Sequence, residues 1–230
     1  MDEFIGLINQ ERELLNLSFK GSQMGFLGLE ALRQSKFEDL QWLELEDCGL
    51  QSIAGHLLSE LLGSCKRLDY LSLAKNSRFE NGGLQALADG LESHKLRHLD
   101  LSCCSLAAFE ALEAFAPLLE RLPALQSLLL SSNPGLGTVV APLLELICRT
   151  QISELCLACC NISSIQLSPC SCFLEALDLR GNTEIGPGHL QSLAEQLEMV
   201  KLKRLELSDC GLESQAGGEA IALLLAKWWA

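Results

Sequence analysis

The chain has 230 residues and a formal net charge of −13, with 48% hydrophobic and 20% charged side chains. This composition excludes a disordered chain, and the negative charge argues against general binding to nucleic acid or to an anionic membrane surface, which requires Lys and Arg. The sequence contains no run of 18 apolar residues, so no membrane span is expected, and its acidic start at 1–15 does not resemble a secretory signal.

A repeated pattern of leucines runs along the chain. The pattern is L-x-x-L-x-L-x-x-(C or N)-x-L, and its clear copies begin at residues 40, 68, 96, 125, 152, 174 and 202. A degenerate copy at 14–24 precedes them, which brings the number to about eight repeats at intervals of 22 to 29 residues. A regular period of this length is typical of a solenoid, in which each repeat packs on its neighbours.

Each copy predicts the same succession of elements. The L-x-L segment predicts a short strand with both leucines on one face. Between strands, apolar residues recur at three- and four-residue spacing, which predicts amphipathic helices at 56–65, 83–94, 109–122, 189–200 and 220–230. Strand, turn, helix and return predict a right-handed crossover and parallel strands. Because strands lie about 4.8 Å apart and helices about 8–10 Å apart, the array should bend with its strands on the concave side.

The residue that turns the chain after each strand alternates between Cys and Asn. The turn residues are Cys48, Asn76, Cys104, Asn133, Cys160, Asn182 and Cys210. Asn is expected to hydrogen-bond backbone groups that the turn leaves unpaired, and Cys is a small residue that tolerates burial. The total of 11 cysteines is odd and shows no small disulfide framework, which favours a reducing compartment.

Three segments depart from the pattern. The repeat from 152 to 174 is short, and 163–173 lacks helical periodicity, so an extended or 3₁₀ segment is expected there. Ser22 replaces the expected Asn in the first copy, which suits a capping repeat. No polar cap follows the last helix, so either Trp228 and Trp229 fold back over the end of the core, or the chain is part of something longer.

The alternating turn residues and the 28- and 29-residue intervals closely resemble the ribonuclease-inhibitor-like subfamily of leucine-rich repeats, from about residue 14 to 230. The resemblance implies an α/β leucine-rich-repeat solenoid, a right-handed α/β horseshoe arc with a parallel concave sheet and convex helices. We expect a single domain over 1–230, with an N-terminal cap and degenerate first repeat at 1–39, repeats at 40–212 and a C-terminal helix at 213–230. The resemblance also implies protein binding on the concave face and supplies no catalytic residues.

The residues between the inward leucines should face the concave side on neighbouring strands. The expected partner-binding residues are Trp42, Glu44, Glu46, Tyr70, Ser72, His98 and Asp100. Exposed aromatics beside carboxylates are typical of a binding hot spot. Such a site suits a basic peptide or a protein loop that carries Lys or Arg. Alternatively, they are ordinary strand residues with high β propensity. A second, weaker candidate patch consists of Asp178, Arg180, Arg204 and Glu206, but pairing of these residues with one another across strands is the favoured interpretation.

Zinc binding and catalysis are not expected. Cysteines cluster at Cys156, Cys159, Cys160, Cys170 and Cys172, a pattern that suggests zinc. However, the repeat buries Cys160 in a turn and separates Cys156 from Cys170 and Cys172, so we expect no metal ligands. Oxidation could join Cys170 and Cys172. The histidines form no metal-binding or nucleophile pattern, and glycine-rich phosphate loops are absent from the sequence, so no catalytic residues and no cofactor are expected.

The sequence therefore predicts a protein–protein interaction module rather than an enzyme. Its partner would be a protein, with a basic surface favoured by the acidic concave residues, and not a nucleic acid or a membrane. A cytoplasmic monomer is expected. The alternative is a regulator of an enzyme, either a GTPase activator or an enzyme inhibitor, built on the same repeats.

Overall fold

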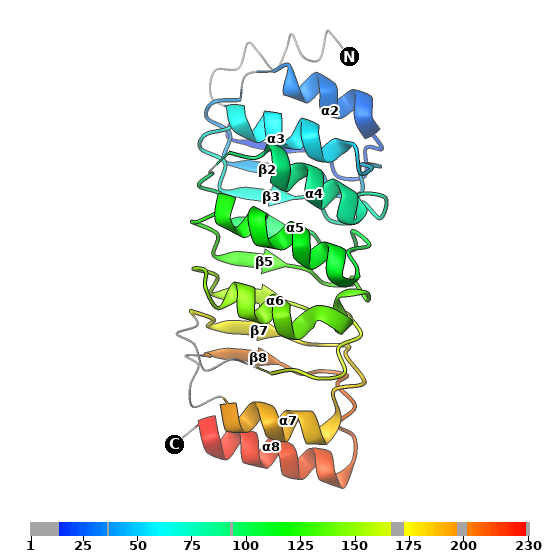
Figure 1. The fold of residues 1–230 in the computed structure, drawn as a ribbon, viewed down its shortest axis with the longest axis vertical. Helices are drawn as coiled ribbons and strands as arrows, with labels where there is room; N and C mark the ends of the chain where they lie inside the picture. Colours follow the sequence, from blue (N-terminus) through cyan, green and yellow to red (C-terminus); the bar gives the residue numbers. More distant parts are fainter. Residues whose placement is uncertain (1–13, 36, 93, 167–172, 197–201, 229–230) are drawn as a thin grey trace. The chain divides into compact units, whose positions relative to one another are not determined.

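The computed structural model describes residues 14–35, 37–92, 94–166, 173–196 and 202–228 (Figure 1). The chain divides into two compact units, Met1–Leu125 and Gln126–Ala230. Both units have the parallel strands and covering helices of an α/β leucine-rich-repeat solenoid. The single domain expected over 1–230 stays a prediction.

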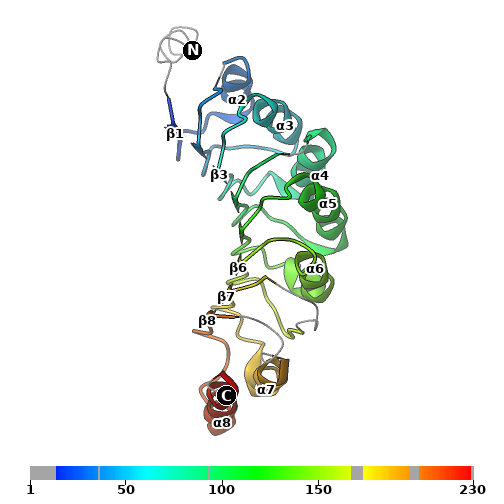
Figure 2. The ribbon, with the colours of Figure 1, turned by 90° about the vertical axis from the view of Figure 1, so that its left-hand side faces the viewer.

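In the described part of the first unit, short parallel strands follow one another in chain order. They are β1 (Asn16–Ser18), β2 (Trp42–Glu44), β3 (Tyr70–Ser72) and β4 (His98–Asp100). The helices are α2 (Gly25–Arg33), α3 (Ala54–Ser64), α4 (Glu80–Gly90) and α5 (Ala108–Arg121), and each packs on the next. Within this unit the strands lie on one side and the helices on the other (Figure 2), so the strand face is not covered by helices.

The second unit has the same organisation, with three α-helices and one 3₁₀ helix among its described residues. Its strands are β5 (Ser127–Leu129), β6 (Glu154–Cys156), β7 (Ala176–Asp178) and β8 (Arg204–Glu206), paired in parallel in that order. Its helices are η1 (Leu136–Val139), α6 (Val140–Ile147), α7 (Gly186–Gln196) and α8 (Gln215–Trp228). Between β6 and β7, the described residues 157–166 and 173–175 contain no helix. The rest of the segment expected to be extended or 3₁₀, residues 167–172, lies outside the described part of the chain.

The leucines of the repeat form the core. In the repeat around β2, Leu40, Leu43, Leu45 and Leu50 are all almost fully buried, and the equivalent positions of the repeats around β3 to β7 are buried in the same way. In the first and last repeats most of these positions are only half-buried. Leu43 lies within the strand between Trp42 and Glu44, whose side chains point to the opposite face because successive strand residues alternate. The leucines therefore position the residues between them on the open strand face.

The Asn side chains in the turns connect neighbouring repeats. Asn76 is only 2% exposed. Its Oδ1 accepts hydrogen bonds from the backbone N–H groups of Cys48 and Leu50, both at 3.0 Å. Its Nδ2 donates to the carbonyl oxygens of Leu45 at 2.8 Å and Leu73 at 2.7 Å. One amide thus satisfies four buried backbone groups, three of them in the preceding repeat, and Asn182 makes the equivalent contacts in the second unit.

The Cys side chains complete this arrangement. The thiols of Cys48, Cys104, Cys160 and Cys210 donate to the carbonyl oxygens of Phe19, Leu73, Leu130 and Leu179, respectively, at 3.0 to 3.2 Å. Burial raises the pKa of Cys104 and of Cys160 to about 12, so both remain protonated donors at neutral pH. The expected burial of the small Cys side chains in the turns is confirmed.

His94 is held as a neutral ring inside the first unit. It is 5% exposed, its Nδ1 accepts a hydrogen bond from the Leu96 N–H at 3.0 Å, and its Nε2 lies 3.0 Å from the carbonyl oxygen of Cys65. Since Nδ1 is an acceptor, the proton is on Nε2, which donates to Cys65. Burial lowers the pKa of His94 below its ordinary 6.5.

Acidification should therefore destabilise the first unit through His94. Unfolded His94 binds a proton as the pH falls through 6.5, but folded His94 does so only at lower pH. Stability is lost as the pH falls below 6.5, by at most about 1.4 kcal/mol per pH unit from this group. Urea unfolding at several pH values should show a shallower dependence in His94→Gln, with exposed His56→Gln as the control. An identical pH dependence in His94→Gln and the wild-type chain would contradict this assignment.

Candidate functional site

Three aromatic rings lie in a row on the strand face of the first unit. Trp42 on β2 pairs in register with Tyr70 on β3, and Tyr70 with His98 on β4. Trp42 and Tyr70 are stacked, with ring centroids 3.5 Å apart and planes 5° from parallel. The His98 ring is tilted, 6.4 Å from that of Tyr70. Trp42 is 41% exposed and the other two are half-buried. Their expected lateral adjacency is confirmed.

Two carboxylates flank this row along the same strands. Glu44 and Asp100 are both half-buried. Glu44 accepts a hydrogen bond from Ser18 at 2.6 Å, and Asp100 accepts one from the Ser102 N–H at 2.9 Å. Burial, followed by the charge of Asp100, raises the pKa of Tyr70, so this phenol stays protonated at neutral pH. The rings and carboxylates together make an aromatic, acidic surface.

Two residues that we expected on this surface are buried instead. Ser72 is 1% exposed, because its small side chain lies between the longer Glu44 and Asp100 on the neighbouring strands. Glu46 is 9% exposed, since the ammonium groups of Lys20 and Lys75 lie 2.7 Å from its two oxygens. Hydrogen bonds from both lysines lower the pKa of Glu46. The expectation that Ser72 and Glu46 are exposed to a partner is therefore wrong.

A pocket that the sequence analysis did not anticipate opens beside Trp42. It has a volume of about 570 Å³ and lies where the chain enters the strands of the first unit. Its lining residues are Asn16, Gln41, Trp42, Lys66, Arg67, Leu68, Asp69, Lys95 and Arg97. The cations lie within two residues of the first leucine of two successive repeats, Leu68 and Leu96, and two of them, Arg67 and Lys95, occupy equivalent repeat positions. If the repeats are aligned, a comparison of the residues next to this first leucine reveals the cations.

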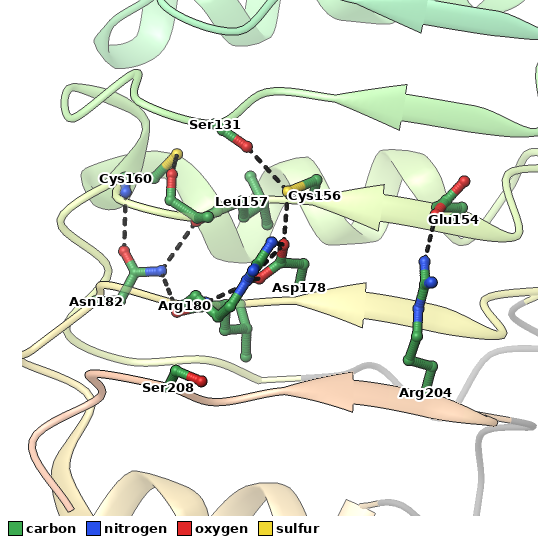
Figure 3. A network of polar contacts seen from close by, with 12 residues as sticks. Ser131, Glu154, Cys156, Leu157, Cys160, Asp178, Arg180, Asn182, Arg204 and Ser208 are labelled. Carbon is green, nitrogen blue, oxygen red and sulfur yellow. Dashed lines mark hydrogen bonds and ion pairs between the residues drawn. The ribbon is translucent and has the colours of Figure 1, made fainter.

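The second unit has a polar network on its strand face (Figure 3). The thiol of Cys156 donates to Asp178 at 3.1 Å and lies 2.9 Å from the hydroxyl of Ser131. Arg180 binds Asp178 at 2.7 Å, so these two residues do pair internally, but within one repeat and not across strands as expected. Arg204, however, pairs with Glu154 two strands away and not with Asp178 or Glu206, because its long side chain reaches across β7.

These contacts leave little reactivity in the network. Burial, outweighing the hydrogen bond from Ser131, raises the pKa of Cys156, so its thiol is protonated at neutral pH. Burial also tends to raise the pKa of Asp178, but hydrogen bonds from the Arg180 side chain and backbone outweigh it and lower the pKa overall. The network is a set of satisfied pairs, which is the structural role expected of cross-strand neighbours.

Metal-binding groups and membrane-spanning helices can be assessed only for the described residues. Among them, no group of three or more His, Cys, Asp and Glu side chains is placed to hold a metal ion, and Cys170 and Cys172 lie outside that part of the chain, as does Trp229. A search of the same residues finds no helix with the length and apolar character needed to cross a membrane.

Comparisons with known proteins agree with the repeat. A Leucine Rich repeat family model matches residues 92–108 and 170–194. NACHT, LRR and PYD domains-containing protein 12 of Mus musculus is 31% identical over 93% of this chain and 21% of its own length. Ribonuclease inhibitor of Mus musculus is 27% identical over 93% of this chain and 50% of its own. The crystal structure of leucine-rich repeat-containing protein LegL7 from Legionella pneumophila matches with a TM-score of 0.45 and 14% identity, over 94% of this chain and 91% of that one.

The chain thus spans about one fifth of the length of the NACHT, LRR and PYD relatives and half of ribonuclease inhibitor. The family-model match and these relatives agree with the buried leucines and with the turn residues that join neighbouring repeats. The chain therefore belongs to the leucine-rich-repeat family, with repeats of the ribonuclease-inhibitor-like type.

Proposed function

We propose that this chain is a protein-interaction module whose aromatic face binds a Lys- or Arg-bearing loop of a protein partner. The aromatic face consists of Trp42, Tyr70 and His98 with Glu44 and Asp100. The observation that carries the proposal is the Trp42–Tyr70 stack, because it keeps a large ring 41% exposed on a surface free of helices. Large, rigid aromatic side chains lose little conformational entropy on binding and dominate many interfaces.

The charges beside the rings support a basic partner. Among the described residues, no Lys or Arg nitrogen lies within 4.0 Å of the carboxylates of Glu44 and Asp100. Glu46 differs, because Lys20 and Lys75 already compensate its charge. A cationic side chain of the partner can therefore interact with Glu44 and Asp100 without displacing an internal ion pair, and can lie against the Trp42 ring.

The same proposal includes a non-enzymatic monomer in a reducing, cytoplasmic environment. All nine described cysteines are free, which supports that environment. An open strand face excludes little water, which is unfavourable for acid–base catalysis. The name of the ribonuclease inhibitor relative favours an enzyme inhibitor as the second candidate. Assays of ribonuclease activity, and of GTP hydrolysis by candidate GTPases, with and without the chain would test the regulatory alternative.

The aromatic face is tested with the double variant Trp42→Ala/Tyr70→Ala. Loss of two central aromatic anchors should weaken partner binding by roughly 30-fold or more, since hot-spot residues contribute about 2 kcal/mol or more. The immobilised wild-type and variant chains would be compared for proteins retained from cytosol, and each retained protein would then be purified and titrated by calorimetry.

The matched control is Ile53→Ala/Phe109→Ala, which removes two exposed apolar side chains outside the strands of the same unit. This control should keep the wild-type affinity, and circular dichroism should show that both double variants remain folded. A purified partner that binds Trp42→Ala/Tyr70→Ala as tightly as the wild-type chain would exclude the aromatic face as its site.

A further inference from the structure

The pocket beside Trp42 has a charge opposite to that of the chain. The chain carries a net charge of −13 and has 17 Lys and Arg residues in total. Four of them, Lys66, Arg67, Lys95 and Arg97, line this pocket, and Asp69 is the one carboxylate among its described lining residues. Four positive charges and one negative charge leave a local balance of +3. We refer to Lys66, Arg67, Lys95 and Arg97 as the cationic edge.

The repeat explains why these cations gather. Arg67 and Lys95 each precede the first leucine of a repeat, and Arg97 follows one. Since β3 and β4 pair in register, Arg67 and Lys95, which are equivalent in the repeat, come just before neighbouring strands. Lys66 and Arg97 lie within two residues of them in the sequence. The cationic edge is therefore a lateral cluster formed by two successive repeats, although its members lie up to 31 residues apart in the sequence.

Much of this charge is open to a ligand. Arg67 pairs with Asp39 at 2.8 Å, and Arg97 lies 3.5 Å from Asp69. All of these groups are at the surface, where ion pairs contribute little and an incoming carboxylate can compete with them. No carboxylate of the described residues lies within 4.0 Å of the ammonium groups of Lys66 and Lys95.

The rest of the pocket is not a simple anion site. Trp42 forms an apolar wall, and the side-chain amides of Asn16 and Gln41 can both donate and accept hydrogen bonds. A peptide uses all three kinds of surface: its carboxylates meet the cations, its backbone groups meet the amides, and an apolar side chain meets Trp42. Nucleic acid would also meet the negative field of the remaining chain over its whole length, which opposes its association.

We propose that this pocket is a binding site for a short acidic peptide segment, with two or more Asp or Glu residues next to an apolar residue. Its carboxylates lie against the cationic edge, and its apolar side chain contacts Trp42. The site is adjacent to the aromatic face and shares only Trp42 with it. It does not depend on the binding of a basic loop by Glu44 and Asp100.

The test uses the full chain and a fluorescein-labelled peptide, Glu-Glu-Leu-Asp-Glu with capped ends, in an anisotropy titration at low salt. A Lys-Lys-Leu-Lys-Lys peptide with the same label is measured in parallel. Substitution of all four residues of the cationic edge by Gln should weaken binding of the acidic peptide by about tenfold or more. Raising the salt concentration should weaken binding to the wild-type chain as well, because exposed charges are screened.

The control variant replaces the exposed cations Arg78, Arg121, Arg149 and Lys203 by Gln, which changes the net charge by the same amount. It should bind the acidic peptide within about twofold of the wild-type chain, apart from a small loss of long-range attraction. The variant Glu44→Gln/Asp100→Asn should also keep its affinity for the acidic peptide and lose affinity only for the lysine peptide. This separates the cationic edge from the proposed function of the aromatic face.

Three results would overturn the proposal. The first is the absence of acidic-peptide binding to the wild-type chain at concentrations up to about 1 mM, which is weaker than most specific recognition. The second is equal weakening by the two quadruple variants, which would reveal a nonspecific charge effect. The third is binding of inorganic phosphate or ATP as tightly as the peptide, with displacement of the peptide, which would define a general anion site.

Discussion

Replacing Asn76 with alanine should destabilise the first unit by about 4 kcal/mol. The Asn76 amide makes four short hydrogen bonds to the backbone of two repeats and is almost fully buried. The substitution leaves two N–H groups and two carbonyl oxygens without their partner, and each such buried group costs on the order of 1–3 kcal/mol, with incomplete additivity. Urea unfolding followed by circular dichroism would measure the change in the free energy of unfolding.

Two further variants show whether hydrogen bonding is the cause. Asn76→Asp keeps the oxygen that accepts from Cys48 and Leu50, but places a second oxygen against the carbonyls of Leu45 and Leu73, so it should be at least as destabilising as alanine. Exposed Asn16→Ala should change stability by no more than about 0.5 kcal/mol. Equal stability of Asn76→Ala and the wild-type chain would show that this turn does not join the repeats as described.

Gly55→Ala should also be destabilising, by about 1–3 kcal/mol, because it overpacks the contact between α3 and α4. A Cβ at Gly55 would lie 2.2 Å from the carbonyl oxygen of Gly83 and 2.8 Å from the backbone nitrogen of Leu87. Both neighbours are backbone atoms of α4, so no side-chain rotation relieves the contact and α3 itself must shift. Thermal and urea unfolding of the variant would measure the loss.

Gly63→Ala is the matched control on the same helix. Nothing lies within 4 Å of a Cβ at this position, so the substitution should bring only the higher helix propensity of alanine, about 0.5–1 kcal/mol of stabilisation. If Gly55→Ala lowers the free energy of unfolding and Gly63→Ala raises it, the spacing between the helices, rather than the glycine content, controls stability. If Gly55→Ala were as stable as Gly63→Ala, the close approach of α3 and α4 would be refuted.

The strands and turns were predictable because the repeat imposes them. Each L-x-L segment alternates a buried leucine with an outward residue, and the structure places strands at these segments. The predicted starts of the helices were less accurate. The pattern predicted a helix at 83–94, but α4 begins at Glu80. Phe79 precedes it without a side-chain capping hydrogen bond, so the sequence lacks the usual Ser, Thr, Asp or Asn signal for a helix start.

The candidate site was predictable only in part, because the repeat determines which residues are neighbours but not how exposed they are. Strand register follows from the repeat, and therefore the neighbours Trp42, Tyr70 and His98 could be identified in advance. Exposure depends on the lengths and partners of surrounding side chains, which a repeat pattern does not contain. Hence Ser72 and Glu46 were expected to be exposed and are buried. The cationic edge was missed because its residues lie beside the first leucine of the pattern, whereas the expected site was drawn only from positions beside the second and third leucines.

The spacing of the strands also limits which backbone can follow the aromatic row. Trp42, Tyr70 and His98 occur once per strand, so they recur with the strand separation of about 4.8 Å. An extended chain laid across the strands presents side chains on one face about 6.7 Å apart. Its third such side chain therefore lies about 4 Å beyond the ring on the third strand. An α-helix advances about 5.4 Å per turn, so its side chain two turns further along lies only about 1 Å beyond the ring on the third strand. A helix crossing β2, β3 and β4 can thus offer one side chain per turn to each ring in succession.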